Sequence, residues 1–154
     1  MPTYASNTDV TTGRSREEIE RTLRRYDADA FAYATNRTQA MIGFEAGGRQ
    51  IRFVLPMPDR NSTEFTLTPT KRRRSEPEAE KAWEQACRQR WRALSLVIKA
   101  KLEAVEAGIV TFEQEFAMHM VLPGGRTVSE EVLPAIATAY ATGTAPALMP
   151  GHSS

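Results

Sequence analysis

Four consecutive cations, Lys71, Arg72, Arg73 and Arg74, are the side chains whose type and spacing point most directly to chemistry. Ammonium and guanidinium groups bind phosphate oxygens, and a run of them gives affinity for a nucleic-acid backbone that depends on salt and not on base sequence. A globular core does not accommodate four adjacent cations, so we expect them on an exposed loop. There they act either as a flexible phosphate clamp or as a solvated segment that keeps the protein soluble.

Charge is unevenly distributed along the 154 residues, although the net charge is only +1. Residues 37–101 carry fourteen Lys or Arg against seven Asp or Glu, whereas residues 102–154 carry Arg126 against six acids. Arginine outnumbers lysine sixteen to four, and guanidinium groups suit bidentate phosphate contacts. Such asymmetry is a hint of nucleic-acid binding.

Further candidate contacts lie on both sides of the basic run. Phe31, Phe44 and Phe53 alternate with other residues and would serve as stacking platforms for bases, unless their face packs against a helix. The hydroxyl of Tyr33 favours a position at a solvent-exposed edge of the sheet. The candidate residues for nucleic-acid binding are therefore Lys71, Arg72, Arg73, Arg74, Arg52, Arg49, Arg60, Tyr33, Arg88, Arg92 and Lys99.

No catalytic signature accompanies these cations. The sequence has no P-loop, dinucleotide fingerprint, nucleophile elbow or His-Glu-x-x-His element. Glu115 and His119 share a helix face but lack a third metal ligand, and Cys87 lies on an apolar stripe, which favours a buried thiol over a nucleophile. We therefore expect a protein that is not an enzyme, with no metal and no cofactor.

A long helix, predicted over residues 75–108, must position the basic run that precedes it. Ser75 and Glu78 form a capping-box pair at its start, and Gly108 supplies the left-handed residue that ends such helices. One apolar stripe follows the helical period: Trp83, Cys87, Trp91, Leu94, Ile98, Leu102 and Val105. A basic flank lies on another side: Lys81, Arg88, Arg92 and Lys99.

Two cations, Arg90 and Lys101, project into the apolar arc of this helix. Each must extend its charged end to water, pair with a carboxylate or face another polar group. The arc spans more than half the circumference when Val97 and the neighbouring alanines are counted. We therefore expect the helix to be covered from two sides, by a sheet and by either residues 111–120 or a second subunit.

Residues 30–69 change to the alternating period of strands. Three runs alternate around residues 31–33, 40–44 and 51–55, and the glycines of AGGR, residues 46–49, predict a hairpin turn. Phe65 and Leu67 predict a short fourth strand. The expectation is a four-stranded antiparallel meander.

Shorter helices flank these two elements. Ser15 and Glu18 predict the start of an N-terminal helix, after a flexible tail over residues 1–14. Residues 111–120 and 129–143 predict two C-terminal helices, the second of which starts late or is kinked at Pro134. Residues 144–154 are predicted to be a tail. The fold class is thus a single α+β domain over residues 15–143, in which the N-terminal helix, meander, long helix and shorter helices follow one another.

Composition narrows the class of protein further. A single cysteine excludes an intramolecular disulfide, and no apolar run approaches the length of a membrane span. The amino terminus, MPTYASNTDVTTG, lacks the basic start and apolar core of a signal peptide. We expect no membrane association and a cytoplasmic location.

Two segments, EKAWEQACRQRWRALSLVIKAKLEAVEAGIVTFEQEF and LPGGRTVSE, resemble a family of small, functionally uncharacterised proteins of tailed bacteriophages and prophages. The similarity runs over residues 14–150. The resemblance implies a location in the host cytoplasm and a role in DNA replication, recombination, host takeover or counter-defence. It brings no catalytic residues.

The predicted order of four strands, a basic loop and a long helix is also similar to that of Whirly-type and transcription-cofactor-type single-stranded DNA-binding proteins, which pair through their helices. Our first hypothesis is therefore a homo-oligomer that binds single-stranded DNA without strong sequence preference in phage DNA replication or recombination. The alternative is a protein-binding module, an inhibitor or adaptor of a host protein, whose basic run meets an acidic partner.

Overall fold

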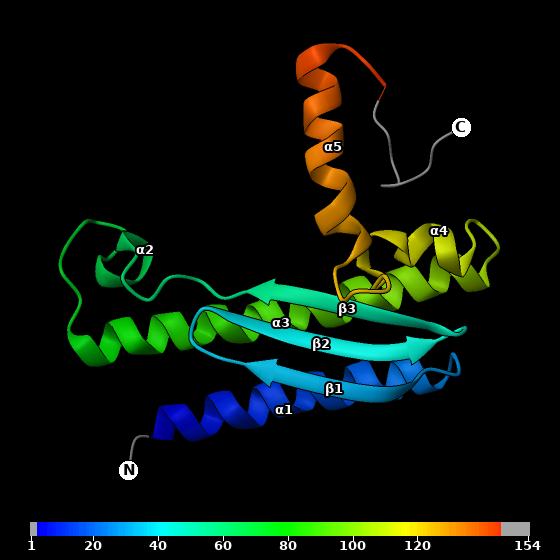
Figure 1. The fold of residues 1–154 in the computed structure, drawn as a ribbon. Coiled ribbons are helices and arrows are strands. Elements are labelled where there is room, and N and C mark those ends of the chain that lie inside the picture. Colours follow the sequence, from blue (N-terminus) through cyan, green and yellow to red (C-terminus); the bar gives the residue numbers. More distant parts are fainter. Residues whose placement is uncertain (1–2, 146–154) are drawn as a thin grey trace.

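The computed structural model describes residues 3–145, with side chains described from residue 13 onward. A sheet and a layer of two long helices form the body of the molecule, and the last helix stands away from both (Figure 1). Residues 146–154, which include most of the predicted C-terminal tail, lie outside the described residues. The elements in chain order are α1 (Thr3–Arg24), β1 (Asp29–Thr35), β2 (Gln39–Ala46), β3 (Arg49–Pro56), α2 (Thr63–Thr66), α3 (Glu76–Glu106), α4 (Phe112–Phe116), η1 (Ala117–His119) and α5 (Val128–Thr142).

The sheet is antiparallel, with three strands in the order β1-β2-β3. Ala46 pairs with Arg49, which leaves Gly47 and Gly48 as the two turn residues of the β2–β3 hairpin. Their φ angles are 58° and 74°, the positive values that a two-residue hairpin turn of this kind requires. The hairpin predicted at AGGR is confirmed.

The predicted fourth strand is wrong. Residues 63–66 form the single turn α2, whose N-cap Ser62 accepts a hydrogen bond from the backbone N–H of Glu64. Phe65, which lies in this turn, is buried. Leu67 forms only an isolated antiparallel β-bridge, to Arg73. A run with two apolar residues is too short to establish a period, so the side-chain cap decides between helix and strand.

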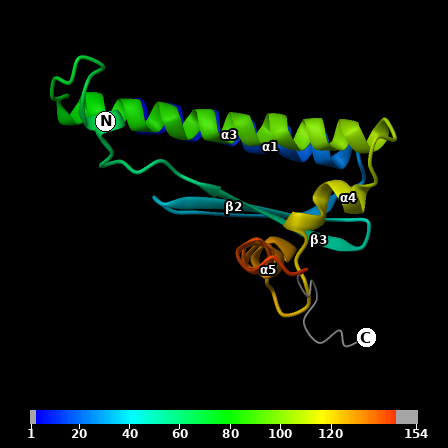
Figure 2. The ribbon, with the colours of Figure 1, turned by 90° about the horizontal axis from the view of Figure 1, so that it is seen from above.

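One face of the sheet is covered by α1 and α3, which run side by side in the same direction (Figures 1 and 2). The side chains of β2 and β3 alternate between this covered face and the opposite one, as the period of two requires. The core between the layers contains Ile19, Leu23, Ile42, Phe44, Ile51, Phe53, Trp91, Leu94, Ile98, Leu102 and Phe116.

The long helix α3 confirms the prediction closely. The Ser75 hydroxyl accepts a hydrogen bond from the backbone N–H of Glu78. At the other end Gly108, with φ 77°, donates to the Val105 carbonyl, and Ile109 donates to the Ala104 carbonyl. These two bonds form a Schellman motif, which satisfies carbonyls that the end of a helix leaves unpaired.

The N-terminal helix starts earlier than predicted. It begins at Thr3, so residues 3–14, expected as a flexible tail, are helical, and Ser15 is a buried residue inside α1 and not its cap. Residues 3–12 are rich in Thr, Ser and Asn, which have modest helix propensity. The support for this part of α1 is its position along α3 (Figure 2), and a local sequence pattern does not reveal such a neighbour.

The second face of the sheet has no helix lying over it among the described elements. The helix α5 is on that side of the sheet (Figure 2), but it projects beyond the β3 edge instead of crossing the strands (Figure 1). Its N-cap is Thr127 and its end is Gly143, with φ 72°. It does not start late, because Pro134 lies inside it. The carbonyl of Glu130, which has no Pro134 N–H to pair with, accepts a 3.1 Å hydrogen bond from Arg126 Nη2.

Candidate nucleic-acid interface

The basic run lies on a closed turn immediately before α3. The Thr68 N–H donates to the Arg72 carbonyl at 2.7 Å, and the Arg72 N–H donates to the Thr68 hydroxyl at 3.0 Å. Arg74 then donates its N–H to the Thr66 carbonyl at 2.8 Å. Lys71 occupies the tip, with φ 65°, in the left-handed region that is costly for a residue other than glycine. The predicted exposure of the run is confirmed for Lys71, Arg72 and Arg73.

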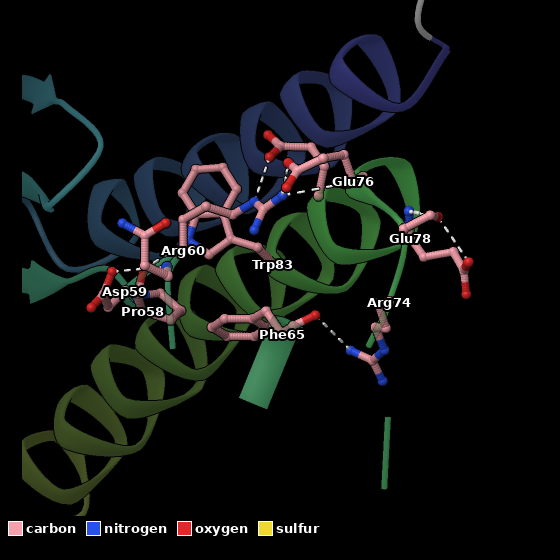
Figure 3. Close-up of polar contacts among 11 residues, drawn as sticks. Pro58, Asp59, Arg60, Phe65, Arg74, Glu76, Glu78 and Trp83 are labelled. Atoms are coloured by element: carbon pink, nitrogen blue, oxygen red, sulfur yellow. Dashed lines mark hydrogen bonds and ion pairs between the residues drawn. The ribbon is translucent and has the colours of Figure 1, made fainter. Parts of the chain in front are cut away.

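Arg74 differs from its three neighbours because its side chain turns back into the protein. Its Nη1 donates to the carbonyls of Glu64 and Phe65, both at 3.3 Å (Figure 3). The guanidinium thereby satisfies carbonyls of α2 that the end of this short helix leaves free. A hollow of about 580 Å³ lies beside it, lined by residues of the turn that include Thr68 and Lys71 and by residues of α2 that include Glu64. Three of the four consecutive cations, the basic turn 71–73, therefore face solvent.

The basic flank of α3 begins near the N-terminal end of the helix, which directly follows the basic turn. Lys81 to Lys99 spans about 27 Å of helix axis. Lys81 and Arg88 have interaction partners within the chain. Arg92 and Lys99 are exposed, and among residues 13–145 neither has a recorded acidic partner. The basic turn therefore lies just before the first turn of α3, whereas Arg92 and Lys99 follow along the helix, in its middle and in its C-terminal half.

Arg60 is held inside the chain. Its Nε donates to Glu80 Oε2 at 2.7 Å and its Nη2 to Glu76 Oε2 at 3.1 Å, so two carboxylates of the first turns of α3 bind it (Figure 3). The hydrogen bond that Arg60 donates to Glu80 is the main cause that raises the pKa of the Arg60 guanidinium. Nearby, the Trp83 indole N–H donates to the Pro58 carbonyl at 2.7 Å. Arg60 thus joins the loop after β3 to α3.

Arg49 and Arg52 also have acidic partners and lie away from the basic turn. Arg49, at the β2–β3 hairpin, is 3.3 Å from Glu113. Arg52 points to the uncovered face of the sheet, where it donates to the Gly125 carbonyl at 2.7 Å and reaches Glu130 at 3.4 Å. Both arginines connect the sheet to the C-terminal segment, so the structure does not bring them together with the predicted clamp.

The aromatic residues proposed as stacking platforms face the helices. Phe44 and Phe53 are 1% and 5% exposed. The Tyr33 hydroxyl donates to Glu20 Oε1 at 2.7 Å, and the Arg16 guanidinium lies over its ring. Burial, followed by this bond to Glu20, raises the pKa of Tyr33. The uncovered face of the sheet instead carries small and aliphatic residues: Ala32, Ala34, Met41, Gly43 and Val54.

The two cations inside the apolar arc of α3 both have polar partners. Lys101 Nζ lies 3.2 Å from Glu115 Oε1, and it also donates to the Glu115 carbonyl at 3.4 Å. Arg90 Nη1 donates to the Pro56 carbonyl at 3.2 Å. Sequence reasoning predicted such partners without naming them, because the sequence does not show that α4 and the end of β3 flank the helix.

An apolar strip on the solvent side of α3 accompanies the cations. Leu96 is 60% exposed and Val97 is 46% exposed, and Ala93 and Ala100 lie beside them. Residues 111–120 contact α3 at Lys101, within the predicted arc, and the side chains of Leu96 and Val97 remain exposed beside this contact. A second subunit as the cover stays a prediction.

The residues considered for catalysis have other contacts. Burial is the main cause that raises the pKa of the Cys87 thiol to about 11, and the side chain is 7% exposed. Glu115 binds Lys101, and the His119 ring stacks on Phe53 with centroids 4.0 Å apart. Within residues 13–145 no three His, Cys, Asp or Glu side chains are grouped so that they could hold a metal ion.

Comparisons with protein-family models, curated proteins and solved structures found no match to this chain. The resemblance to the phage family therefore stays a prediction. Among the described helices, none combines the length and the apolar character needed to cross a bilayer.

Proposed function

We propose that the protein binds single-stranded nucleic acid, DNA in the first place, through phosphate contacts and without base-sequence preference. The contacts come from Lys71, Arg72 and Arg73 in the basic turn and from Arg92 and Lys99 on α3. In the phage context that the resemblance implies, such a protein serves DNA replication or recombination in the host cytoplasm.

The observation that carries this proposal is the division of the candidate cations into two groups. Arg49, Arg52 and Arg60 are each bound to a carboxylate of the same chain. The five cations named above have no such partner among residues 13–145. Unpaired cations that face solvent are available to replace the counterions of a phosphate backbone.

The preference for a single strand over a duplex follows from an apolar side chain beside the cations of α3. The exposed side chain of Leu96 is four residues from Arg92 and three from Lys99, so it lies on the same face of α3 as both. Bases of a single strand are free to contact apolar side chains, whereas the bases of a duplex are stacked inside it. The distance from the turn to Lys99, about 35 Å along the helix axis, corresponds to several nucleotides of an extended strand.

Competition binding tests the proposal. A fluorescent oligothymidine of about 20 nucleotides is titrated with the full chain at low salt and followed by anisotropy. We expect saturable binding that unlabelled single strands displace more effectively than a duplex of equal length. No binding at low salt, or a preference for duplex, overturns the proposal.

The alternative, a protein-binding module, is favoured by a different observation. Leu133 and Tyr140 of α5 are 51% and 88% exposed, and α5 has no buried residue. Exposed apolar residues of this kind mark contacts between proteins. For an inhibitor or adaptor of a host protein, the basic turn would meet an acidic surface. Binding of an acidic protein by a chain that does not bind the oligothymidine at low salt would favour this alternative.

A further inference from the structure

Among the described residues, two apolar surfaces have no helix or strand lying across them. The first is the uncovered face of the sheet, where Ala34, Met41 and Val54 stand opposite one another on the three strands, and Ala32 pairs with Gly43. The second is α5, which contains no charged residue from Val132 to Thr142 and no buried residue. A sheet normally buries one helical layer on each apolar face, and a helix of this composition normally packs on such a face.

The chain cannot bring its own α5 onto its own sheet. The segment before α5 is fixed to the β3 edge, where the Val121 N–H donates to the Gln50 carbonyl at 2.8 Å and the Val128 N–H donates to the Met120 carbonyl at 2.9 Å. Arg52 adds its 2.7 Å bond to the Gly125 carbonyl. These contacts direct α5 away from the three strands (Figure 1).

We infer that α5 packs on the uncovered sheet face of a second copy of this chain, and that the second copy returns its own α5 in the same way. The direction of α5 supports this exchange, because the helix leaves the β3 edge on the side of the uncovered face (Figure 2). A second sheet placed beside that edge receives the helix on its own uncovered face. The exchange is reciprocal, which is the pattern of a closed twofold dimer.

The dimensions of the two surfaces agree. The fifteen residues of α5 extend about 22 Å at 1.5 Å per residue. Three strands about 4.8 Å apart are narrower than that, so one helix crosses the whole sheet. Glycine and alanine at the centre of the sheet face leave a flat surface on which a helix lies closely.

The distribution of charge on the two apolar surfaces favours a second copy of this chain as the partner over a nucleic acid. The central residues of both surfaces are uncharged, which offers nothing to a phosphate backbone. Arg52 on this face already binds Glu130 of the same chain, and the other charged residue of β2 and β3 on this face, Glu45, is an acid at the end of β2 that repels phosphate. One chain supplies both the apolar helix and the apolar face, so a second copy satisfies both at once. The dimer does not depend on the proposed nucleic-acid function.

Photocrosslinking tests this arrangement in the full-length protein. Tyr140 is replaced by the photoreactive residue p-benzoylphenylalanine in a sample that mixes ordinary and ¹⁵N-labelled chains. The substituted side chain stays at an exposed position, so the fold is retained. We expect a covalent dimer after irradiation, with adducts between chains of different isotope content that map to β1, β2 or β3. Adducts only within one chain, adducts on α3, or no covalent dimer overturn the inference.

Charge substitutions provide a second, independent readout by light scattering. Ala34→Asp on the sheet face and Leu133→Asp on α5 are each expected to reduce the mass from dimer to monomer, with unchanged circular dichroism in the helical region. Leu96→Asp, on the exposed strip of α3, is the matched control and is expected to leave the dimer intact. A monomeric native protein, or a dimer that only Leu96→Asp dissociates, contradicts the exchange.

Discussion

The Arg60 guanidinium and the Glu80 carboxylate form a 2.7 Å hydrogen bond between the loop after β3 and the second turn of α3. The Arg60 side chain is 14% exposed and also binds Glu76. In the sequence, Arg60 resembles a phosphate ligand. Its pairing with Glu80 shows that it has a structural role instead. Charge-assisted hydrogen bonds at a partly buried site are worth more than exposed ion pairs.

We predict that Arg60→Met lowers the free energy of unfolding by roughly 1–2 kcal/mol, because it leaves Glu80 without its partner. Urea denaturation measures this loss. Affinity for single-stranded DNA is expected to stay within about twofold of the native value, since the guanidinium is already occupied. Arg72→Met is the matched control, with the opposite pattern of unchanged stability and weaker binding. Weaker binding by Arg60→Met at native stability would make Arg60 a phosphate ligand after all.

The thiol of Cys87 is predicted to be unreactive in the folded protein. Burial, together with the nearby Glu84 carboxylate, raises its pKa to about 11, and only the thiolate is nucleophilic. Reaction with a disulfide reagent at about pH 8 should be slower by roughly 100-fold or more in buffer than in urea. An Ala93→Cys variant places a second thiol on the exposed side of the same helix and should react promptly in buffer. Equal rates for Cys87 with and without urea would contradict its burial.

Stability is predicted to depend on pH through His119. Burial first, and then the charge of Lys101, lower its pKa in the folded state below the usual value of 6.5. At higher pH the imidazole is neutral in both states and contributes nothing. As the pH falls below about 6.5, the unfolded chain takes up a proton that the folded chain does not, so the free energy of unfolding decreases.

The His119→Phe variant isolates this contribution because it keeps a ring stacked on Phe53. Urea midpoints measured at about pH 7.5 and pH 5.5 should differ less for the variant than for the native chain. Carboxylates contribute equally to both proteins over this interval and therefore cancel. An equal or larger pH dependence in the variant would show that His119 is protonated in the folded state.

Local signals in the sequence identified the elements whose ends are fixed by their own side chains. Ser75 caps α3 as predicted, and Thr111, the first residue of the predicted segment 111–120, caps α4 in a complete capping box with Gln114. The AGGR turn fixed the register of β2 and β3, because only its two glycines adopt positive φ without strain. These features depend on residues a few positions apart, which a sequence displays directly.

Features that depend on distant neighbours were not predictable. The helical state of residues 3–14 rests on the position of α1 along α3. The sequence pattern of Phe31, Phe44 and Phe53 shows an apolar face but not which side of the sheet the helices cover. For the candidate site, the sequence located every cation but did not distinguish Arg60, bound to Glu80, from Arg72, exposed on the turn. Acidic partners of this kind are brought together only by the fold.

The salt dependence of oligothymidine binding tests the central claim most directly. Five unpaired cations predict that log affinity falls linearly with log salt concentration, with a slope of roughly −3.5 for a single strand. Arg72→Ala/Arg73→Ala should make the slope shallower by about 1.4. Arg49→Ala/Arg126→Ala removes the same charge from paired arginines and should leave the slope unchanged. Binding that does not vary with salt, or equal losses in both double variants, would contradict a phosphate-binding surface built from the basic turn and α3.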